Sequence, residues 1–456
     1  MILLMTTAPP LRSPWGVAGR LPPLGLAYVA AALEKNGYKV EIYDNYLLER
    51  PIEEVKSEIR KRSPEIVGLT CNSLSYGRVV EMAKAVREAS PNSRVVVGGP
   101  HASYMPETLL EHTEVDFVVV GEGEQAMARL ASSLVKGEGC AAAGMIPGVA
   151  CKRNGETIKT SPQFISDLDT VPLPARHLLP MQMYIRELSY LSVKPVDTMS
   201  VHRGCPYSCA YCETRELWGS ACRAFSPKRV VDEIQHMVET YGTRGIYFVG
   251  DNFTINKTRT AEICRLIKSS GLDVKWICET RADLLNRELL SEMKSAGCET
   301  MFFGVESGSP RIQRKLNKGI DLDDVVKAFE LCRQAGIQTV TSFMMGIPGE
   351  TVEDMNLSFE FSRKLKADWC QFNIYVACPG SQLYDEVISK RLYDQFYDYL
   401  ARVKTPEFDF DMLTKIQRDF QRQCQKSAAS KLKRVIKQEG LGSAVKKGAS
   451  MIFRRS

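Results

Sequence analysis

The sequence predicts an α/β protein built as a doubly wound parallel sheet, a partial (β/α)6 barrel and a helical C-terminal extension. Two series of short β-rich runs alternate with amphipathic helical segments, which is the pattern of parallel strands joined by helices. A proline-rich stretch separates the two series, and a polar, basic segment follows the second. Because 456 residues exceed one ordinary domain, we expect four parts. They are a front domain of residues 1–138, a linker of 139–195, a barrel of 196–392 and an extension of 393–456.

The first series begins at the N-terminus. Its expected strands are residues 1–5, 39–43, 66–70, 94–97 and 117–120. Its expected helices are residues 24–36, which end before Gly37, and residues 52–61 and 76–89. This order predicts a flavodoxin-like sheet, in which ligands bind at the carboxyl ends of the strands.

The second series begins near residue 198. Its expected strands are residues 198–202, 245–249, 275–279, 300–304, 339–345 and 371–376. Amphipathic helices are expected between them at residues 227–241, 258–269, 287–295 and 322–335. Six such units predict a partial barrel with its catalytic groups at the C-terminal ends of the strands. Beyond about residue 390 the chain is expected to be helical.

Composition limits the classes of function. The net charge of +6 is small for this length and does not by itself indicate nucleic-acid binding. Most of the 14 cysteines lie singly in apolar or mixed segments, where we expect buried thiols rather than a disulfide framework. The sequence shows neither an export signal nor an apolar stretch of membrane-spanning length, so we expect a cytoplasmic, reduced protein.

The sharpest motif is HRGCPYSCAYC at residues 202–212, directly after a predicted strand. Its three cysteines can bind soft metals as thiolates. A four-iron cluster held by three thiolates keeps one iron open for a substrate or cofactor. The alternative is a structural zinc site with His202 as fourth ligand, although the second cysteine pair usual in such sites is absent from the sequence.

The spacing Cys-x-x-x-Cys-x-aromatic-Cys after a first barrel strand resembles the radical S-adenosylmethionine (SAM) superfamily, over about residues 198–390. The resemblance implies that Cys205, Cys209 and Cys212 hold a [4Fe-4S] cluster whose open iron binds SAM. It implies that an electron from the cluster cleaves SAM to a 5′-deoxyadenosyl radical, which takes hydrogen from the substrate. An external electron donor of the flavodoxin or ferredoxin type would supply that electron.

The resemblance also assigns SAM contacts at successive strand ends. They are Tyr211, Asp251, Asn252, Glu279, Arg281, Glu306, Ser307, Gly346 and Ile347. Each match alone is weak, because Asp251 can also be a helix cap and Glu306 can be half of a buried ion pair. Their recurrence at the strand ends favours a cofactor site.

Three loops of the front domain are candidate ligand contacts. They contain Thr70, Ser73 and Leu74; Gly98, Gly99 and His101; and Gly121, Glu122 and Gly123. Glycines there let a backbone approach a flat or phosphorylated ligand, and ordinary turn glycines are the alternative. A front domain of this kind before a radical SAM barrel resembles the cobalamin-dependent radical SAM enzymes, which implies cobalamin as a third cofactor. The Asp-x-His-x-x-Gly signature is absent, so we expect cobalamin with its own base displaced and no histidine on cobalt.

The family resemblance implies methylation of an unactivated carbon in a small-molecule or lipid substrate. Radical-mediated ring closure or carbon–carbon coupling is one alternative. A methylthiotransferase acting on RNA or protein is a second, and it would need a further three-cysteine site that Cys71, Cys140 and Cys151 are too scattered to form. A non-catalytic corrinoid or zinc-binding module is the third.

The C-terminal tail gives an indication of substrate class, because basic and apolar residues are interspersed from about residue 431. A basic amphipathic helix can lie on an anionic membrane, which would suit a lipid substrate. A solvated basic face or a disordered tail is the alternative that we favour. We therefore expect a cytoplasmic protein, with peripheral membrane contact as the alternative. We expect no nucleic-acid partner, since aromatic residues are not interleaved with the basic ones.

Overall fold

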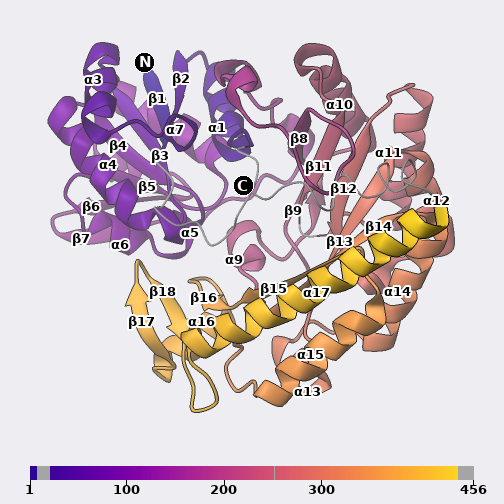
Figure 1. The fold of residues 1–456 in the computed structure, drawn as a ribbon. Coiled ribbons are helices and arrows are strands. Elements are labelled where there is room, and N and C mark those ends of the chain that lie inside the picture. The colour runs from indigo at the N-terminus through magenta and orange to yellow at the C-terminus, as the bar shows by residue number, and fades with distance from the viewer. Residues whose placement is uncertain (8–20, 251, 440–456) are drawn as a thin grey trace.

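The computed structural model describes residues 1–7, 21–250 and 252–439, with side chains up to residue 424. Two α/β units lie side by side, and a long C-terminal helix crosses below the second (Figure 1). Residues of the linker pack against the front unit. Leu179, Met181 and Tyr184 form a small buried cluster with Ala27 of that unit.

The front unit is a seven-stranded sheet in the order β2-β1-β3-β4-β5-β6-β7. The first five strands are parallel, as predicted: β1 (Ile2–Thr6), β2 (Val40–Asp44), β3 (Ile66–Thr70), β4 (Arg94–Gly98) and β5 (Phe117–Val119). Helices α1 (Leu24–Lys35) and α7 (Gly123–Val135) pack on one face, and α3 (Ile52–Arg62) and α4 (Tyr76–Ala89) pack on the other. The doubly wound prediction is therefore confirmed.

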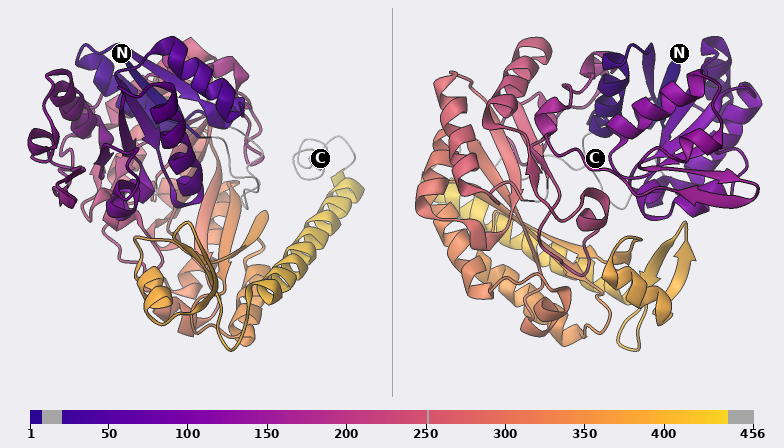
Figure 2. Two further views of the ribbon diagram at one scale, coloured as in Figure 1. Left: turned by 90° about the vertical axis from the view of Figure 1, so that its left-hand side faces the viewer. Right: turned by 180° about the vertical axis from the view of Figure 1, so that it is seen from behind.

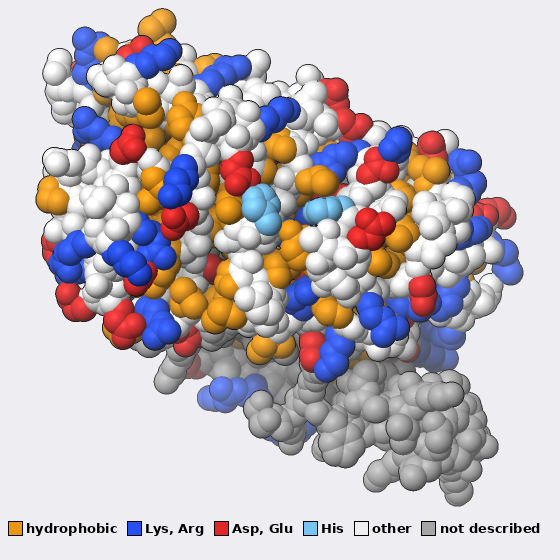
Figure 3. Space-filling model, turned by 90° about the horizontal axis from the view of Figure 1, so that it is seen from above, with side chains coloured by type: hydrophobic (Ala, Val, Ile, Leu, Met, Phe, Trp, Pro, Cys, Tyr) orange, Lys and Arg blue, Asp and Glu red, His pale blue; other side chains and the backbone are white. Residues whose placement is uncertain are grey.

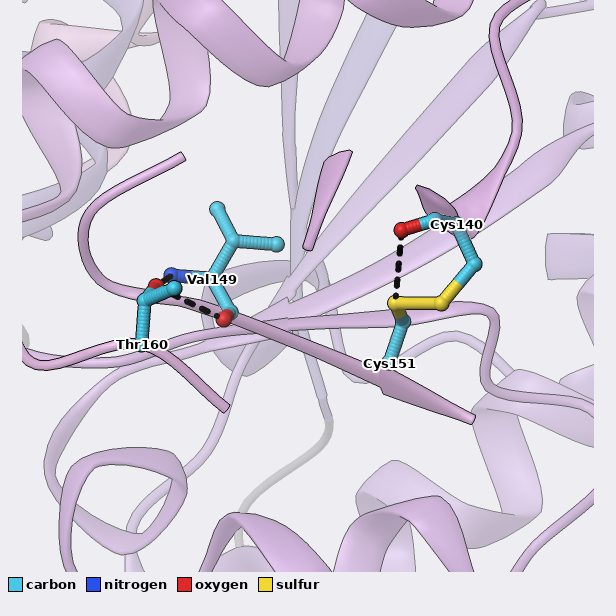
Figure 4. The surroundings of a disulfide bond; sticks show 4 residues. All are labelled: Cys140, Val149, Cys151 and Thr160. Carbon is cyan, nitrogen blue, oxygen red and sulfur yellow. Dashed lines mark hydrogen bonds between the residues drawn. A yellow bond between two sulfur atoms is a disulfide. The ribbon is translucent and has the colours of Figure 1, made fainter. Parts of the chain in front are cut away.

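The predicted linker contributes strands to this sheet. Strands β6 (Val149–Arg153) and β7 (Glu156–Lys159) form an antiparallel hairpin beside β5. The hairpin covers a sheet edge that would otherwise leave backbone groups unpaired. A disulfide between Cys140 and Cys151 ties β6 to the preceding short helix α8 (Cys140–Ala143), so the expectation of free thiols is wrong for this pair (Figure 4).

The second unit is a six-stranded, fully parallel sheet in the order β15-β14-β13-β12-β11-β8. Its strands are β8 (Val196–Ser200), β11 (Gly245–Val249), β12 (Lys275–Thr280), β13 (Cys298–Glu306), β14 (Gln338–Met345) and β15 (Trp369–Ile374). The helices between them are α10 (Pro227–Tyr241), α11 (Lys257–Ser269), α12 (Arg287–Ser295), α13 (Pro310–Leu316), α14 (Leu322–Ala335) and α15 (Val352–Leu365). The sheet curves with its helices outside, so the partial barrel is confirmed (Figure 2).

The C-terminal part is only partly helical. After α16 (Gln382–Ser389), strands β17 (Tyr393–Tyr397) and β18 (Leu400–Val403) form a hairpin next to β16 (Val376–Ala377), so the expected helix after residue 390 is wrong there. The turn residues Asp398 and Tyr399 both have positive φ angles, which is the conformation of tight hairpin turns. Helix α17 (Phe410–Glu439) then packs along β15, as the helical prediction requires.

The tip of this hairpin rests on the front unit. The Tyr399 ring meets the rings of Tyr76 and His101 at centroid distances of 5.1 and 5.4 Å. A Cβ atom at Gly77 would lie 3.1 Å from the Asp398 carboxylate, so this carboxylate sits beside the first turn of α4. An anion near a helix N-terminus is favourable. The hairpin therefore forms a contact between the two units in addition to the chain connection through the linker.

Within the described residues, no helix is both long and apolar enough to cross a membrane. On the upper face of the molecule, Lys and Arg side chains are interspersed with Asp and Glu side chains over both units (Figure 3). The charge on this face is thus mixed, as the small net charge suggests.

Candidate active site

The three clustered cysteines lie in one loop at the C-terminal end of the first barrel strand. The two-residue strand β9 (His202–Arg203) leads into the loop and pairs with β10 (Arg223–Ala224). Gly204 has φ +88°, and a Cβ atom there would lie 2.1 Å from the carbonyl oxygen of Ala221. Only glycine fits this position without a shift of the backbone.

The barrel also holds the far part of the loop. The Ala210 amide donates to the Leu316 carbonyl at 2.8 Å, and the Asn317 side chain donates to the Ser208 carbonyl at 2.9 Å. Cys205, Cys209 and Cys212 are half-buried. Their thiols are therefore presented at the strand ends by a backbone that is fixed on both sides.

These residues fit an iron–sulfur cluster better than a single zinc ion. Cysteine thiolates are the usual ligands of iron–sulfur clusters, and a four-iron cluster held by three of them keeps one iron open. In the described part of the chain, no three His, Cys, Asp or Glu side chains converge closely enough to hold one ion. His202, the fourth ligand of the zinc alternative, instead lines a cavity toward the front unit.

Glu306 ends β13 and forms a polar cluster with Tyr211 and Lys318. Its carboxylate Oε1 accepts from the Lys318 ammonium at 2.8 Å and from the Tyr211 hydroxyl at 3.0 Å. Burial and the neighbouring carboxylate raise the pKa of Tyr211, so the phenol stays protonated and donates. Glu306 has φ +69°, and its carboxylate folds back over Gly304, where a Cβ atom would lie 2.2 Å away. Glu306 is thus half of a buried ion pair.

Asn252 and Arg281 meet beside this cluster. Asn252 is buried, and its amide nitrogen has no hydrogen-bond partner among the described residues. The Arg281 guanidinium is engaged by the Lys318 and Gly319 carbonyls and lies over the Tyr207 ring at 3.7 Å. Arg281 therefore orders the loops around the strand ends, while Asn252 offers a free donor.

The other predicted SAM contacts divide into accessible and enclosed positions. Glu279 is half-buried and accepts a hydrogen bond from the Tyr247 hydroxyl. Ser307 is fully buried against Ser358, so its side chain is structural. Asp251 lies outside the described residues.

The Gly346–Ile347 turn is closed by the protein itself. Both amides donate to the Glu350 carboxylate, at 2.7 and 3.0 Å. A Cβ atom at Gly346 would lie 2.6 Å from the Leu413 side chain of α17. Burial raises the pKa of Glu350 to about 8 despite these two donors. The backbone amides of this turn are therefore committed to Glu350.

A cavity of about 450 Å³ lies between the strand ends of the front unit and the barrel. Of the predicted corrinoid contacts, it is lined by Thr70, Gly98, Gly99, Gly121 and Gly123. Its deeper wall is apolar and includes Leu4, Val29, Val96, Val119 and Met127.

The glycines shape the cavity wall. Gly99 has φ +102°, and a Cβ atom there would lie 2.7 Å from the Cys71 carbonyl oxygen. A wall of bare backbone above an apolar channel suits a flat ligand with a tail.

Four predicted corrinoid contacts lie outside the residues that line this cavity: Ser73, Leu74, His101 and Glu122. His101 is fully buried between Ser73 Oγ at 3.0 Å and Thr108 Oγ1 at 3.1 Å, and burial lowers its pKa to about 4. Glu122 pairs with Arg223 at 2.6 Å. Helix α5 (Pro100–Tyr104) starts directly after Gly99 and turns the His101 side chain toward α4 and α6 (Pro106–Leu110), away from the strand ends.

Sequence reasoning missed the barrel side of the cavity. Its wall there includes Ser200, His202, Arg203, Trp218 and Gly250. The buried Arg203 guanidinium pairs with Glu124 of the front unit at 2.5 Å and lies 5.1 Å from the centroid of the Trp218 ring. The available signal was the place of Arg203 in the chain, two residues before the first clustered cysteine.

Comparison with known proteins agrees with this two-part site. The family model of the Radical SAM superfamily matches residues 199–361, and that of the B12 binding domain matches residues 16–131. An uncharacterized methyltransferase of Pyrococcus horikoshii is 33% identical over 86% of this chain and 83% of its own length. The anaerobic magnesium-protoporphyrin IX monomethyl ester cyclase of Rubrivivax gelatinosus is 28% identical over 86% of this chain and 71% of its own length. The radical SAM methyltransferase TsrM of Kitasatospora setae, solved with cobalamin and a [4Fe-4S] cluster, shares the fold with a TM-score of 0.70 and 20% identity, over 85% of this chain and 74% of its own.

Proposed function

This chain belongs to the cobalamin-dependent radical SAM enzymes, and from that membership we propose that it methylates an unactivated carbon of a small-molecule substrate. Its cofactors are a [4Fe-4S] cluster, SAM and cobalamin. Cluster and SAM together supply a radical that removes hydrogen from carbon, and the corrinoid supplies the methyl group.

The observation that carries the proposal is that the cavity and the cysteine loop share one short segment. His202 and Arg203 line the cavity of the front unit, and the first cysteine of the cluster loop follows two residues later. A substrate held between the two sites would face both cofactors at once. Hydrogen removal and methyl delivery at the same carbon need this proximity.

We propose that Cys205, Cys209 and Cys212 hold the cluster. Asn252 would bind a polar group of SAM, because its amide nitrogen has no hydrogen-bond partner among the described residues. Glu306 would bind another through its carboxylate at the end of β13. The strand-end glycines around Gly99 would approach the corrinoid with bare backbone.

The barrel strands offer further polar groups for a small substrate. Tyr247 donates to Glu279, and the Asn373 amide donates to Ser342 Oγ at 2.9 Å. Side chains on β11, β12, β14 and β15 thus form hydrogen-bonded pairs, and we propose that a polar substrate contacts them. A lipid substrate and membrane contact through the basic tail are the alternative, and the tail beyond residue 439 lies outside the described residues. The electron donor would be an external flavodoxin or ferredoxin.

The test is anaerobic reconstitution of the wild type, Cys209→Ala and the control Cys424→Ala. Cys424 is also half-buried but lies on α17, outside the cluster loop. We expect Cys209→Ala alone to lose iron, sulfide and 5′-deoxyadenosine formation. Equal SAM cleavage in all three proteins would reject the cluster assignment.

Methylation is tested separately by product analysis with reductant and cobalamin. A methylating enzyme converts part of the SAM to S-adenosylhomocysteine as well as to 5′-deoxyadenosine. Formation of 5′-deoxyadenosine without S-adenosylhomocysteine would favour the alternative of radical ring closure or carbon–carbon coupling.

A further inference from the structure

His202 is a buried imidazole that the protein itself leaves unpaired. It is 4% exposed and lines the cavity between the two units. Its ring lies against Gly250, where a Cβ atom would be 3.1 Å from Cε1. Neither Nδ1 nor Nε2 has a hydrogen-bond partner among the described residues.

The polar groups around His202 are occupied elsewhere. The hydroxyl of Ser200 donates to the His202 carbonyl oxygen at 3.4 Å. The Arg203 guanidinium pairs with Glu124 through Nη2, while Nη1 lies 3.4 Å from the Glu122 carboxylate and has no hydrogen-bond partner among the described residues. Arg259, from the outer side, donates to the carbonyls of Val201 and Phe225 at 2.8 and 2.9 Å. The imidazole therefore finds no partner in the surrounding wall.

Without a ligand, the burial of this imidazole costs free energy. The ring nitrogens lose their hydrogen bonds to water and make none to the protein in return. Burial, with the nearby Arg259 charge, lowers the pKa of His202 to about 4. The ring is thus neutral at physiological pH, with one nitrogen a donor and the other an acceptor.

We propose that His202 is the barrel-side contact of the corrinoid and that it binds a peripheral carboxamide of the corrin ring rather than cobalt. A carboxamide offers both an acceptor oxygen and donor N–H groups, so amides at the ring edge can satisfy both imidazole nitrogens. Coordination to cobalt would satisfy one nitrogen and leave the other buried and unpaired. The inference rests on the assignment of the cavity to the corrinoid.

Two matched pairs of variants test the role of the nitrogens. The first pair is the wild type and His202→Phe, which keeps a planar ring but has no ring nitrogens. The second pair is His202→Gln, which keeps a hydrogen-bond donor and an acceptor, and His202→Met, which has a similar shape without them. Cobalamin is titrated anaerobically into cluster-loaded protein and followed by its absorbance. We expect Phe and Met to weaken binding about tenfold, the factor that corresponds to 1.4 kcal/mol, and Gln to stay within about threefold of the wild type. Iron content checks that the cluster loop remains intact.

The electron paramagnetic resonance spectrum of bound cob(II)alamin separates the two modes of contact. We expect no nitrogen splitting from the protein in the wild type or in His202→Phe. A splitting that disappears in His202→Phe would show a cobalt ligand and overturn the proposal. Equal cobalamin affinity of the wild type and of the Phe and Met variants would also overturn the proposal for His202. A wild type that takes up no cobalamin would instead refute the assignment of the cavity to the corrinoid. If His202→Phe loses iron, the cobalamin affinities of His202→Gln and His202→Met are compared instead. Equal affinities of these two variants would overturn the proposal.

Discussion

The buried pair of Lys318 and Glu306 makes a strong prediction about the barrel mouth. The two side chains are 8% and 9% exposed, and their charged atoms are 2.8 Å apart. Lys318→Met would remove the cation and leave the Glu306 carboxylate buried with the Tyr211 hydroxyl as its remaining donor. Removal of one partner of a buried ion pair costs about 3–5 kcal/mol, because the other charge stays desolvated without compensation.

A double-mutant cycle separates this penalty from ordinary packing loss. Glu306→Gln combined with Lys318→Met removes both charges, so the pair should cost less than the sum of the single variants, with a coupling of about 2–3 kcal/mol. Tyr211→Phe is the control that removes one hydrogen bond, and it should cost about 1 kcal/mol.

The assay is urea unfolding at pH 7 followed by tryptophan fluorescence, in which Trp276 reports from the buried face of β12. A cost below 1 kcal/mol for Lys318→Met, or strict additivity in the cycle, would refute the idea of a desolvated, mutually dependent pair. In that case Glu306 would be solvated enough to keep its charge without help, and its folded-back conformation would need another cause.

Three further predictions concern other parts of the molecule. The raised pKa of Glu350, about 8 against 4.5 in the unfolded chain, means that the unfolded state binds fewer protons between these pH values. The free energy of unfolding should therefore fall as the pH rises from 5 to 8, and Glu350→Gln, which resembles the protonated form, should flatten that slope in urea titrations. Tyr399→Ala should free the hairpin from its aromatic contacts and speed limited proteolysis between β17 and β18, with unchanged cleavage counting against the contact. Thiol titration of the denatured, unreduced protein should find 12 thiols rather than 14. Cys140→Ser should lower the free energy of unfolding by about 3 kcal/mol, because it removes the bond to Cys151.

The sequence predicted the barrel well because its strands carry a strong local signal. Strand β11, for example, is an apolar run followed by a glycine-bearing loop, as expected for parallel strands buried on both faces. The sequence analysis did not predict the hairpin at residues 393–403. This segment is polar, so it was assigned to the same helical extension as the residues that form α17. Its aromatic residues Tyr393, Phe396 and Tyr397 were the β-favouring signal that could have identified it.

For the candidate site, the sequence located loops but not the directions of side chains. Gly98 and Gly99 line the cavity because the backbone itself forms the wall. His101, two residues later, turns away because a helix begins at Pro100 and directs its side chain into the packing with Tyr76. Contacts made by backbone can be inferred from position in a strand–loop unit, whereas contacts made by side chains depend on elements that pack from elsewhere.

That dependence is strongest at the loop that joins the two cofactor sites. Leu316 and Asn317 hold it from the barrel, and Arg203 holds it from the front unit through Glu124, a pair that is almost fully buried. A desolvated charge pair tolerates little displacement, since separation would leave each charge uncompensated. The distance between the cysteine loop and the cavity is therefore held by residues 202–205 and their partners. Any side chain at Gly204 should move the cysteine loop against Ala221 and away from the cavity.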